Sequence, residues 1–143
     1  MQTFLPYPNF RATAAVLDQK RLGKQRVETL QIMKTLRTGR GWVHHPAVIM
    51  WGGFEFGLMQ YQIAICEEWT INRGFKDTCL EKTREIYEDY MPMWGPPELL
   101  PDWLNDHDFH ESHKSNLVRK DPNYYRPLFP NVPDDLEYVW PAE

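Results

Sequence analysis

Apolar residues recur every three or four positions through the middle of this 143-residue chain. The series consists of Val48, Trp51, Phe54, Leu58, Tyr61, Ile65 and Trp69. This period places them on one face of a helix, which predicts a long core helix that begins at Pro46 and ends at Gly74. Gly52 and Gly53 interrupt the series, and we expect them to loosen or kink the helix.

Four other segments carry helical signals, and no segment has the alternating pattern of a strand. The predicted helices cover residues 10–17, 18–36, 77–90 and 109–120. We expect one further turn over 97–100, within the proline-rich connection 91–106, and an irregular aromatic stretch over 124–140. The sequence therefore predicts a single all-α domain over residues 1–143. It should be a compact bundle of three to four main helices with an irregular, aromatic and proline-rich C-terminal arm.

Helix ends and one glycine add detail to this prediction. Asn9 is a good N-cap for the first short helix, and Gly39 should end the helix over 18–36. Gly23 lies inside that helix, where glycine costs up to ~1 kcal/mol relative to alanine. Its presence indicates that another group, most simply a packing partner, approaches the helix closely there.

Charge is distributed unevenly, although the net charge is only −4. Between Arg11 and Arg40, eight cationic residues accompany two carboxylates. Residues 55–111 carry thirteen carboxylates and four cations, whereas residues 113–130 carry four cations and one carboxylate. The two basic segments can form one basic face in the folded protein, which favours a nucleic-acid partner despite the net charge.

The densest basic stretch lies at the start of the predicted helix over 18–36. Its candidate DNA-binding residues are Arg21, Lys24, Gln25 and Arg26. Arg21, Lys24 and Glu28 fall on one side of the helix. A lone carboxylate among cations suits an enzyme that handles an anionic polymer and needs one proton-transfer group. The alternative is a solvated helix face with a Lys24–Glu28 ion pair, worth roughly a few tenths of a kcal/mol.

Three histidines raise the question of a metal site. His107, His110 and His113 are spaced by three, and imidazole is a common ligand of zinc and iron. On a helix each successive side chain is rotated by about 60° from the previous one, so the three do not converge on one ion. Cys66 and Cys79 lack the spacing of a zinc site. We therefore expect no metal and no cofactor.

Tyr124, Tyr125 and Arg126 interleave aromatic rings with a cation near the C-terminus. This pattern suits stacking on bases together with phosphate contact. It equally suits an arm that packs across the helices, and both interpretations remain open.

The α-amine is a further candidate for chemistry. An α-amine titrates near ~7.7 to 8, so it is substantially neutral and nucleophilic at physiological pH. It can attack the anomeric carbon of a sugar and form a Schiff base. Gln2 is too large for the usual removal of an initiator methionine, so the expected nucleophile is the amine of Met1.

Three stretches resemble the pyrimidine-dimer DNA glycosylase/AP-lyase family, which includes the phage-type endonuclease V. These are Asp18-x-x-Arg21-Leu22 followed by Glu28, His45-Pro46 with Asn72-Arg73-Gly74-Phe75, and residues 113–122 with Tyr124-Tyr125. The resemblance implies a compact all-α fold. In this family the amine at the start of the chain attacks C1′ of a distorted nucleotide in duplex DNA, and the glutamate moves protons, so that base loss is followed by β-elimination.

The resemblance also implies roles for particular residues. Met1 and Glu28 would be catalytic. The residues expected to hold DNA phosphates are Arg21, Lys24, Arg26, His113, Arg119 and Lys120. The family motif has arginine directly before the glutamate, whereas this chain has Val27 there. A target base other than a pyrimidine dimer therefore stays open.

We expect no signal peptide, and the sequence has no apolar run long enough for a membrane span. We expect a cytoplasmic monomer in a bacterial or phage-infected cell, acting on damaged or modified double-stranded DNA. One rival hypothesis is a catalytically inactive DNA-binding module of the same fold. Another is a protein–protein adaptor that uses the tryptophan-rich segment from Trp94 to Trp103.

Overall fold

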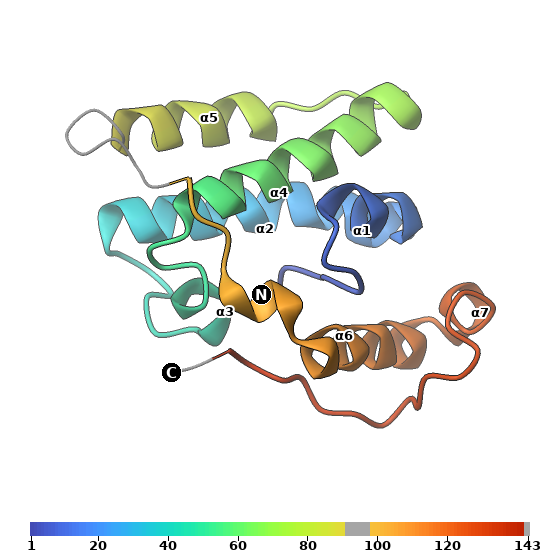
Figure 1. The fold of residues 1–143 in the computed structure, drawn as a ribbon. Helices are drawn as coiled ribbons and strands as arrows, with labels where there is room; N and C mark the ends of the chain where they lie inside the picture. Colours follow the sequence, from blue (N-terminus) through green and yellow to red (C-terminus); the bar gives the residue numbers. More distant parts are fainter. Residues whose placement is uncertain (91–97, 142–143) are drawn as a thin grey trace.

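The computed structural model describes residues 1–90 and 98–141, and all regular structure in them is helical (Figure 1). In these residues four helices exceed ten residues: α2 (Gln19–Thr38), α4 (Glu55–Glu67), α5 (Cys79–Tyr90) and α6 (His107–Lys120). The short ones are α1 (Phe10–Val16), α3 (Pro46–Ile49) and α7 (Pro122–Tyr125). The predicted all-α class with three to four main helices is confirmed.

Helices α2, α4 and α5 pack against one another on one side of the molecule, and α6 lies on the other side (Figure 1). The extended N-terminal segment, residues 1–9, runs between α2 and α6. The Phe4 N–H donates to the side chain of Gln25 on α2, and the Leu5 N–H donates to His113 on α6. Residues 2–6 are buried, so the start of the chain is part of the core.

The predicted caps are confirmed where the sequence signal is strong. The Asn9 side chain accepts the Ala12 N–H at the start of α1. Gly39 ends α2 in the left-handed region at φ 67°, and Gly74 has φ 76° directly after the central helical segment. These conformations suit glycine because it has no Cβ to clash with the following carbonyl.

The continuous helix predicted from Pro46 to Gly74 is wrong in one respect. The chain forms α3, a turn at Gly52 and Gly53, and then α4, which begins at Glu55. Gly53 has φ 84°, which no helix accommodates, so the glycine pair breaks the helix and does not merely kink it. After α4 the chain continues as a π-helical turn, η1 (Glu68–Asn72), up to the predicted stop.

The connection to α6 also differs from the prediction. The single turn is η2 (Asp102–Asn105), a 3₁₀ turn, whereas residues 98–100 are not helical and Pro97 lies outside the described residues. The short helix α7, whose N-cap is Asp121, was not predicted within the C-terminal arm. Within the described ranges, no helix has the length and apolarity needed to cross a bilayer.

Gly23 lies in the N-terminal part of α2, where close packing against Trp69 explains the lack of a side chain. A Cβ built at Gly23 would lie 3.1 Å from the Trp69 ring. Trp69 cannot move away freely, because its indole N–H donates to the Lys76 carbonyl and its ring stacks on Phe75 at 4.4 Å. Gly23→Ala should therefore destabilise the protein by about 1 kcal/mol, because overpacking outweighs the helix-propensity gain.

Urea unfolding of the wild type and of Gly23→Ala measures this free energy. Trp69→Phe replaces the indole with a smaller ring. Gly23→Ala should therefore lower the free energy of unfolding less in the Trp69→Phe background than in the wild type. A Gly23→Ala protein as stable as the wild type would contradict the close packing.

Candidate active site

A cavity of about 300 Å³ opens where the N-terminal segment, α2, α6 and the C-terminal arm meet. Its lining is Met1, Gln2, Phe4, Lys20, Arg21, Lys24, Gln25, Glu28, Lys120 and Tyr138. Two residues predicted to be catalytic, Met1 and Glu28, thus line the same cavity. Four cations surround it, three from α2 and one from the end of α6. The two basic segments of the sequence therefore meet at this point.

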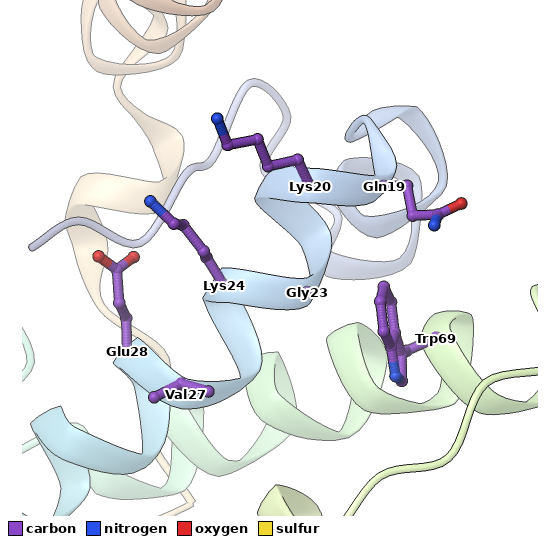
Figure 2. Close-up of a pocket in the computed structure, with 7 residues that line it drawn as sticks. All are labelled: Gln19, Lys20, Gly23, Lys24, Val27, Glu28 and Trp69. Atoms are coloured by element: carbon purple, nitrogen blue, oxygen red, sulfur yellow. The ribbon is translucent and has the colours of Figure 1, made fainter.

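Helical spacing explains how α2 contributes most of the polar wall. Lys20, Lys24 and Glu28 are four residues apart, so their side chains project from the same side of the helix. Figure 2 shows all three directed to that side. Arg21 is held by Asp18, the N-cap of α2, at 3.3 Å. The lysines at positions 20 and 24 are exposed, which leaves both ammonium groups accessible to an anion.

Glu28 has an unusual electrostatic environment for a carboxylate. Burial is the largest influence and raises the pKa of its carboxyl above the usual value. The Met1 ammonium is the strongest influence in the opposite direction, followed by Lys24, a hydrogen bond from Gln25 and Lys120. A carboxyl with a raised pKa, close to an amine, is suited to accept a proton and to return it.

Met1 reaches this cavity because the N-terminal segment is anchored from two sides. On α6, the Leu5 N–H donates to His113 Nδ1 at 2.9 Å, and His110 Nδ1 lies 2.7 Å from the Leu5 carbonyl oxygen. On the other side, the Trp51 indole N–H donates to the Thr3 hydroxyl at 3.0 Å. The N-terminal segment is therefore held in an extended conformation, with its first residue at the cavity.

His113 is a structural contact and not an accessible cation. Its side chain is fully buried, and burial, followed by the charge of His110, lowers its pKa to about 3. The neutral imidazole can accept the Leu5 N–H, whereas an imidazolium cannot. His113 was predicted to contact DNA, but in this fold it is inaccessible to a phosphate.

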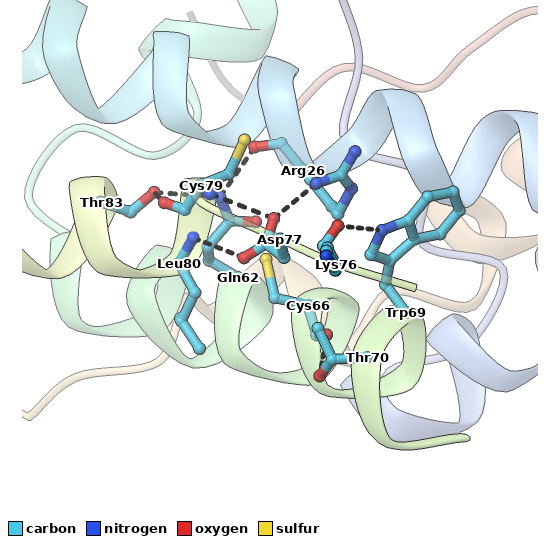
Figure 3. Close-up of polar contacts among 10 residues, drawn as sticks. All are labelled: Arg26, Gln62, Cys66, Trp69, Thr70, Lys76, Asp77, Cys79, Leu80 and Thr83. Atoms are coloured by element: carbon cyan, nitrogen blue, oxygen red, sulfur yellow. Dashed lines mark hydrogen bonds and ion pairs between the residues drawn. The ribbon is translucent and has the colours of Figure 1, made fainter. Parts of the chain in front are cut away.

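Three other residues that were predicted to bind DNA also contact other parts of the protein instead. Arg26 pairs with Asp77 at 2.6 Å (Figure 3) and lies over the Trp69 ring. It does not line the cavity. Arg119 donates to backbone carbonyls of the C-terminal arm, including that of Leu136. Tyr125 is fully buried, and its hydroxyl bonds to Asp18. Arg26 and Tyr125 thus support the scaffold of α2.

Gln25 is likewise buried and was predicted to contact DNA. Its side chain instead donates to Glu28 and to the Gln2 carbonyl, inside the cavity wall. Four lining residues, Gln2, Phe4, Lys20 and Tyr138, were not singled out as site residues from the sequence. The spacing of four to Lys24 could have indicated Lys20, whereas no sequence signal indicates that Tyr138 returns to the start of the chain. Burial raises the pKa of Tyr138 to about 12, so its hydroxyl stays protonated.

A second, open depression lies along α2 next to the cavity (Figure 2). It measures about 720 Å³ and shares Lys20, Lys24 and Glu28 with the cavity. Its apolar part is formed by Val27, which is 43% exposed, and by Trp69 opposite Gly23. A flat apolar group could therefore rest against this depression while an adjoining polar group reaches Glu28.

Within residues 1–90 and 98–141, no group of three histidine, cysteine or acidic side chains is placed to hold a metal ion. His110 uses both ring nitrogens on backbone carbonyls, each at 2.7 Å, those of Leu5 and Leu104. Both cysteines are free thiols in the core.

The segment proposed for an adaptor surface is only partly described, because Trp94 lies outside the described residues. Trp103 packs edge-on against Trp51 at 4.9 Å, and its indole N–H donates to the Met50 carbonyl. The Trp103 side chain thus contributes to packing and hydrogen bonding within the fold.

Comparison with known proteins adds one finding. The family described as pyrimidine dimer DNA glycosylase matches residues 1–83, which include Met1 and all of α2. No curated protein and no solved structure gave a significant match. The matched region thus supplies the N-terminal segment and most of the cavity wall.

Proposed function

This chain belongs to the pyrimidine dimer DNA glycosylase family, and we propose that it removes a damaged pyrimidine from duplex DNA with the α-amine of Met1 and the carboxylate of Glu28. The observation that carries the proposal is the shared cavity. Met1, Glu28 and four cations line it together, and the Met1 ammonium affects the pKa of Glu28. Attack on a DNA sugar requires an amine and a proton acceptor at one site that attracts anions.

In the proposed first stage, the neutral Met1 amine forms a bond to C1′ of the damaged nucleotide. The glycosidic bond breaks, and the base leaves with its electron pair and takes a proton from water. The Glu28 carboxylate accepts a proton from the attached nitrogen. It then returns that proton to O4′ as the C1′–O4′ bond opens, which leaves a Schiff base between the protein and the sugar.

In the proposed second stage, the Schiff base makes the C2′ hydrogen acidic. The Glu28 carboxylate takes this proton, and the C3′–O3′ bond breaks with departure of the 3′ phosphate, so that the strand is cut by β-elimination. Hydrolysis of the Schiff base then frees the protein. The raised pKa of Glu28 supports this role, because a carboxyl that titrates nearer to working pH exchanges protons more readily than an ordinary one.

The cations at the cavity are proposed to hold the phosphates next to the lesion. Lys20, Lys24 and Lys120 are exposed, and Arg21 is half-buried beside them. Binding at this site releases counterions from DNA, so the affinity should fall steeply as salt increases. A cytoplasmic location and a monomeric state remain predictions.

The function is tested by incubating the protein with duplexes that contain single defined lesions, including a pyrimidine dimer and other modified bases. We expect base loss and strand scission at the dimer. The rival hypothesis of an inactive DNA-binding module predicts salt-dependent binding with every duplex left intact. That outcome would contradict the proposed chemistry.

Lys120 provides a test of the proposed phosphate contacts. Lys120→Gln should weaken binding to all duplexes by a similar factor and reduce the slope of log K against log salt by about one, because one phosphate contact is lost. Lys82→Gln on α5 is the matched control, since Lys82 is an exposed lysine that does not line the cavity. Fluorescence anisotropy over a salt series measures both slopes. An equal slope for wild type and Lys120→Gln would exclude this contact.

A further inference from the structure

The side chain of Gln25 occupies a central place between the two proposed catalytic groups. It is fully buried on α2 and has four hydrogen-bonding neighbours. Its Oε1 accepts the Phe4 N–H at 2.9 Å and lies 2.7 Å from the Tyr61 hydroxyl. Its Nε2 donates to the Gln2 carbonyl at 2.8 Å and to Glu28 Oε2 at 2.7 Å.

These four neighbours fix the orientation of the amide. The oxygen faces the Phe4 N–H, which only donates, and the Tyr61 hydroxyl, whose single hydrogen is shared between this oxygen and the Phe4 carbonyl. The nitrogen faces the Gln2 carbonyl and the ionised Glu28 carboxylate, which only accept. A rotation of the amide by half a turn would oppose its NH₂ group to the Phe4 N–H and its oxygen to two acceptors. Both polar atoms of the side chain are thus engaged by the protein.

We propose that Gln25 is the positioning residue of the site: its amide joins the Glu28 carboxylate to the backbone of residues 2–4, and so holds the Met1 amine beside the carboxylate. This inference rests on the proposed function of Met1 and Glu28. The same amide group touches both partners, so a displacement of the N-terminal segment and a displacement of the carboxylate are coupled.

Other residue types cannot make the same connection. Asparagine is one methylene shorter and cannot reach both the segment and Glu28 from the same backbone position. Glutamate would place a second negative charge against Glu28 and would oppose the Gln2 carbonyl with another acceptor. Leucine fills much of the same volume but donates nothing. Gln25→Leu is therefore the informative substitution.

The hydrogen bond from Gln25 also acts on the protonation of Glu28. It favours the ionised carboxylate and so lowers its pKa, against the effect of burial. The other titratable groups that influence Glu28, or that it influences, are Met1, Lys24, Lys120, Tyr61 and Tyr138. Gln25→Leu replaces none of these groups, and a displacement of the Met1 ammonium away from Glu28 would act in the same direction, because that ammonium lowers the pKa of Glu28. The variant should therefore raise the pKa of Glu28, so that less of the carboxylate is ionised at neutral pH.

The first measurement needs no DNA. Titration of the Glu28 side-chain carbon by NMR should give a higher midpoint in Gln25→Leu than in the wild type. Gln62→Leu is the matched control, because Gln62 is an equally buried glutamine that bonds to Thr83 and to the Arg26 carbonyl. Its loss costs buried hydrogen bonds without touching Glu28, so the midpoint should stay at the wild-type value.

A measurement on the wild type covers the case in which Gln25→Leu does not fold. The side-chain NH₂ resonance of Gln25 should titrate with the same midpoint as the Glu28 carbon. An NH₂ resonance that does not follow Glu28, or an unchanged Glu28 midpoint in a folded Gln25→Leu protein, would overturn the inference.

The second measurement uses the rate of strand scission on a duplex with a preformed abasic site. At mildly acidic to neutral pH, Gln25→Leu should be slower by about ten- to a hundredfold, the scale for misplacing a catalytic group. The acidic limb of its pH profile should move to higher pH, with DNA affinity unchanged. For Gln62→Leu, the acidic limb of the pH profile should stay at the pH of the wild type.

An acidic limb that does not move in an active Gln25→Leu protein refutes the positioning role. A wild type inactive on every duplex, with the NMR coupling present, instead refutes the proposed function and leaves the Gln25–Glu28 connection standing.

Discussion

Glu28→Gln should lower the rate of base excision by about a thousandfold, within the range for the loss of a general acid–base group. The amide has nearly the shape of the carboxylate and can still accept the hydrogen bond from Gln25. It cannot accept a proton from the attacking amine, however, and cannot return one to O4′. DNA affinity should be equal or higher, because one negative charge leaves a cavity lined by four cations. Single-turnover kinetics on a dimer-containing duplex, together with a binding titration, separate the two effects.

The stability of Glu28→Gln distinguishes lost chemistry from lost folding. Because burial raises the pKa of Glu28 in the folded protein, ionisation of this group opposes folding. Its contribution to stability is fully present below the unfolded-state pKa and is lost as the pH rises through the higher folded-state pKa. At neutral pH the glutamine variant should thus be at least as stable as the wild type.

Glu67→Gln is the matched control for the kinetic experiment. Glu67 is half-buried, as Glu28 is, and pairs with Arg11 at 2.8 Å outside the cavity. Its replacement should leave excision unchanged. Near-normal excision by a folded Glu28→Gln protein would exclude the carboxylate from the mechanism.

Acetylation of the Met1 amine is the second change with a large expected effect. The nitrogen of an amide shares its lone pair with the carbonyl, so it cannot attack C1′. Strand scission and borohydride trapping should both fall by about a thousandfold or more, because acetylation removes the nucleophile that the proposed mechanism uses. Co-expression with an N-terminal acetyltransferase modifies the α-amine and spares the lysines, and the intact mass confirms a single acetyl group at a chain that begins with Met1.

An extra residue in front of Met1 provides a complementary variant. It retains a free α-amine but can displace that amine by up to about 3.5 Å, the length of one extended residue. Both modified proteins should bind undamaged duplex as the wild type does, since Lys20, Lys24 and Lys120 are unchanged. Undiminished trapping by the acetylated protein would indicate that a lysine of the cavity is the nucleophile.

Local signals in the sequence predicted most of the helices. Asn9 and Gly39 mark helix ends by the chemistry of the side chain or by the lack of one, and such effects act within a few residues. The break between α3 and α4 was not predicted, because the apolar period continues across it. Trp51 is fully buried although it lies in the turn and not in a helix. An apolar residue at helical spacing is therefore buried there without being helical.

The site could be predicted only in part. The spacing of Lys24 and Glu28 on α2 was sufficient to place both at one surface, and amine chemistry together with the family resemblance indicated Met1. The contacts of His113 and Gln25 could not be predicted, because each bonds to the N-terminal segment, which is remote in sequence. His113 is 108 residues from Leu5, its partner. Helical periodicity states which face a residue occupies but not what covers that face.

The location of the covalent bond tests the central claim most directly. Borohydride reduction during the reaction converts the Schiff base into a stable link between protein and DNA, and nuclease and trypsin digestion followed by tandem mass spectrometry identifies the modified residue. We predict the sugar remnant on the α-nitrogen of the peptide Met1–Arg11. A remnant on Lys20, Lys24 or Lys120, with the Met1 amine unmodified, would contradict the account.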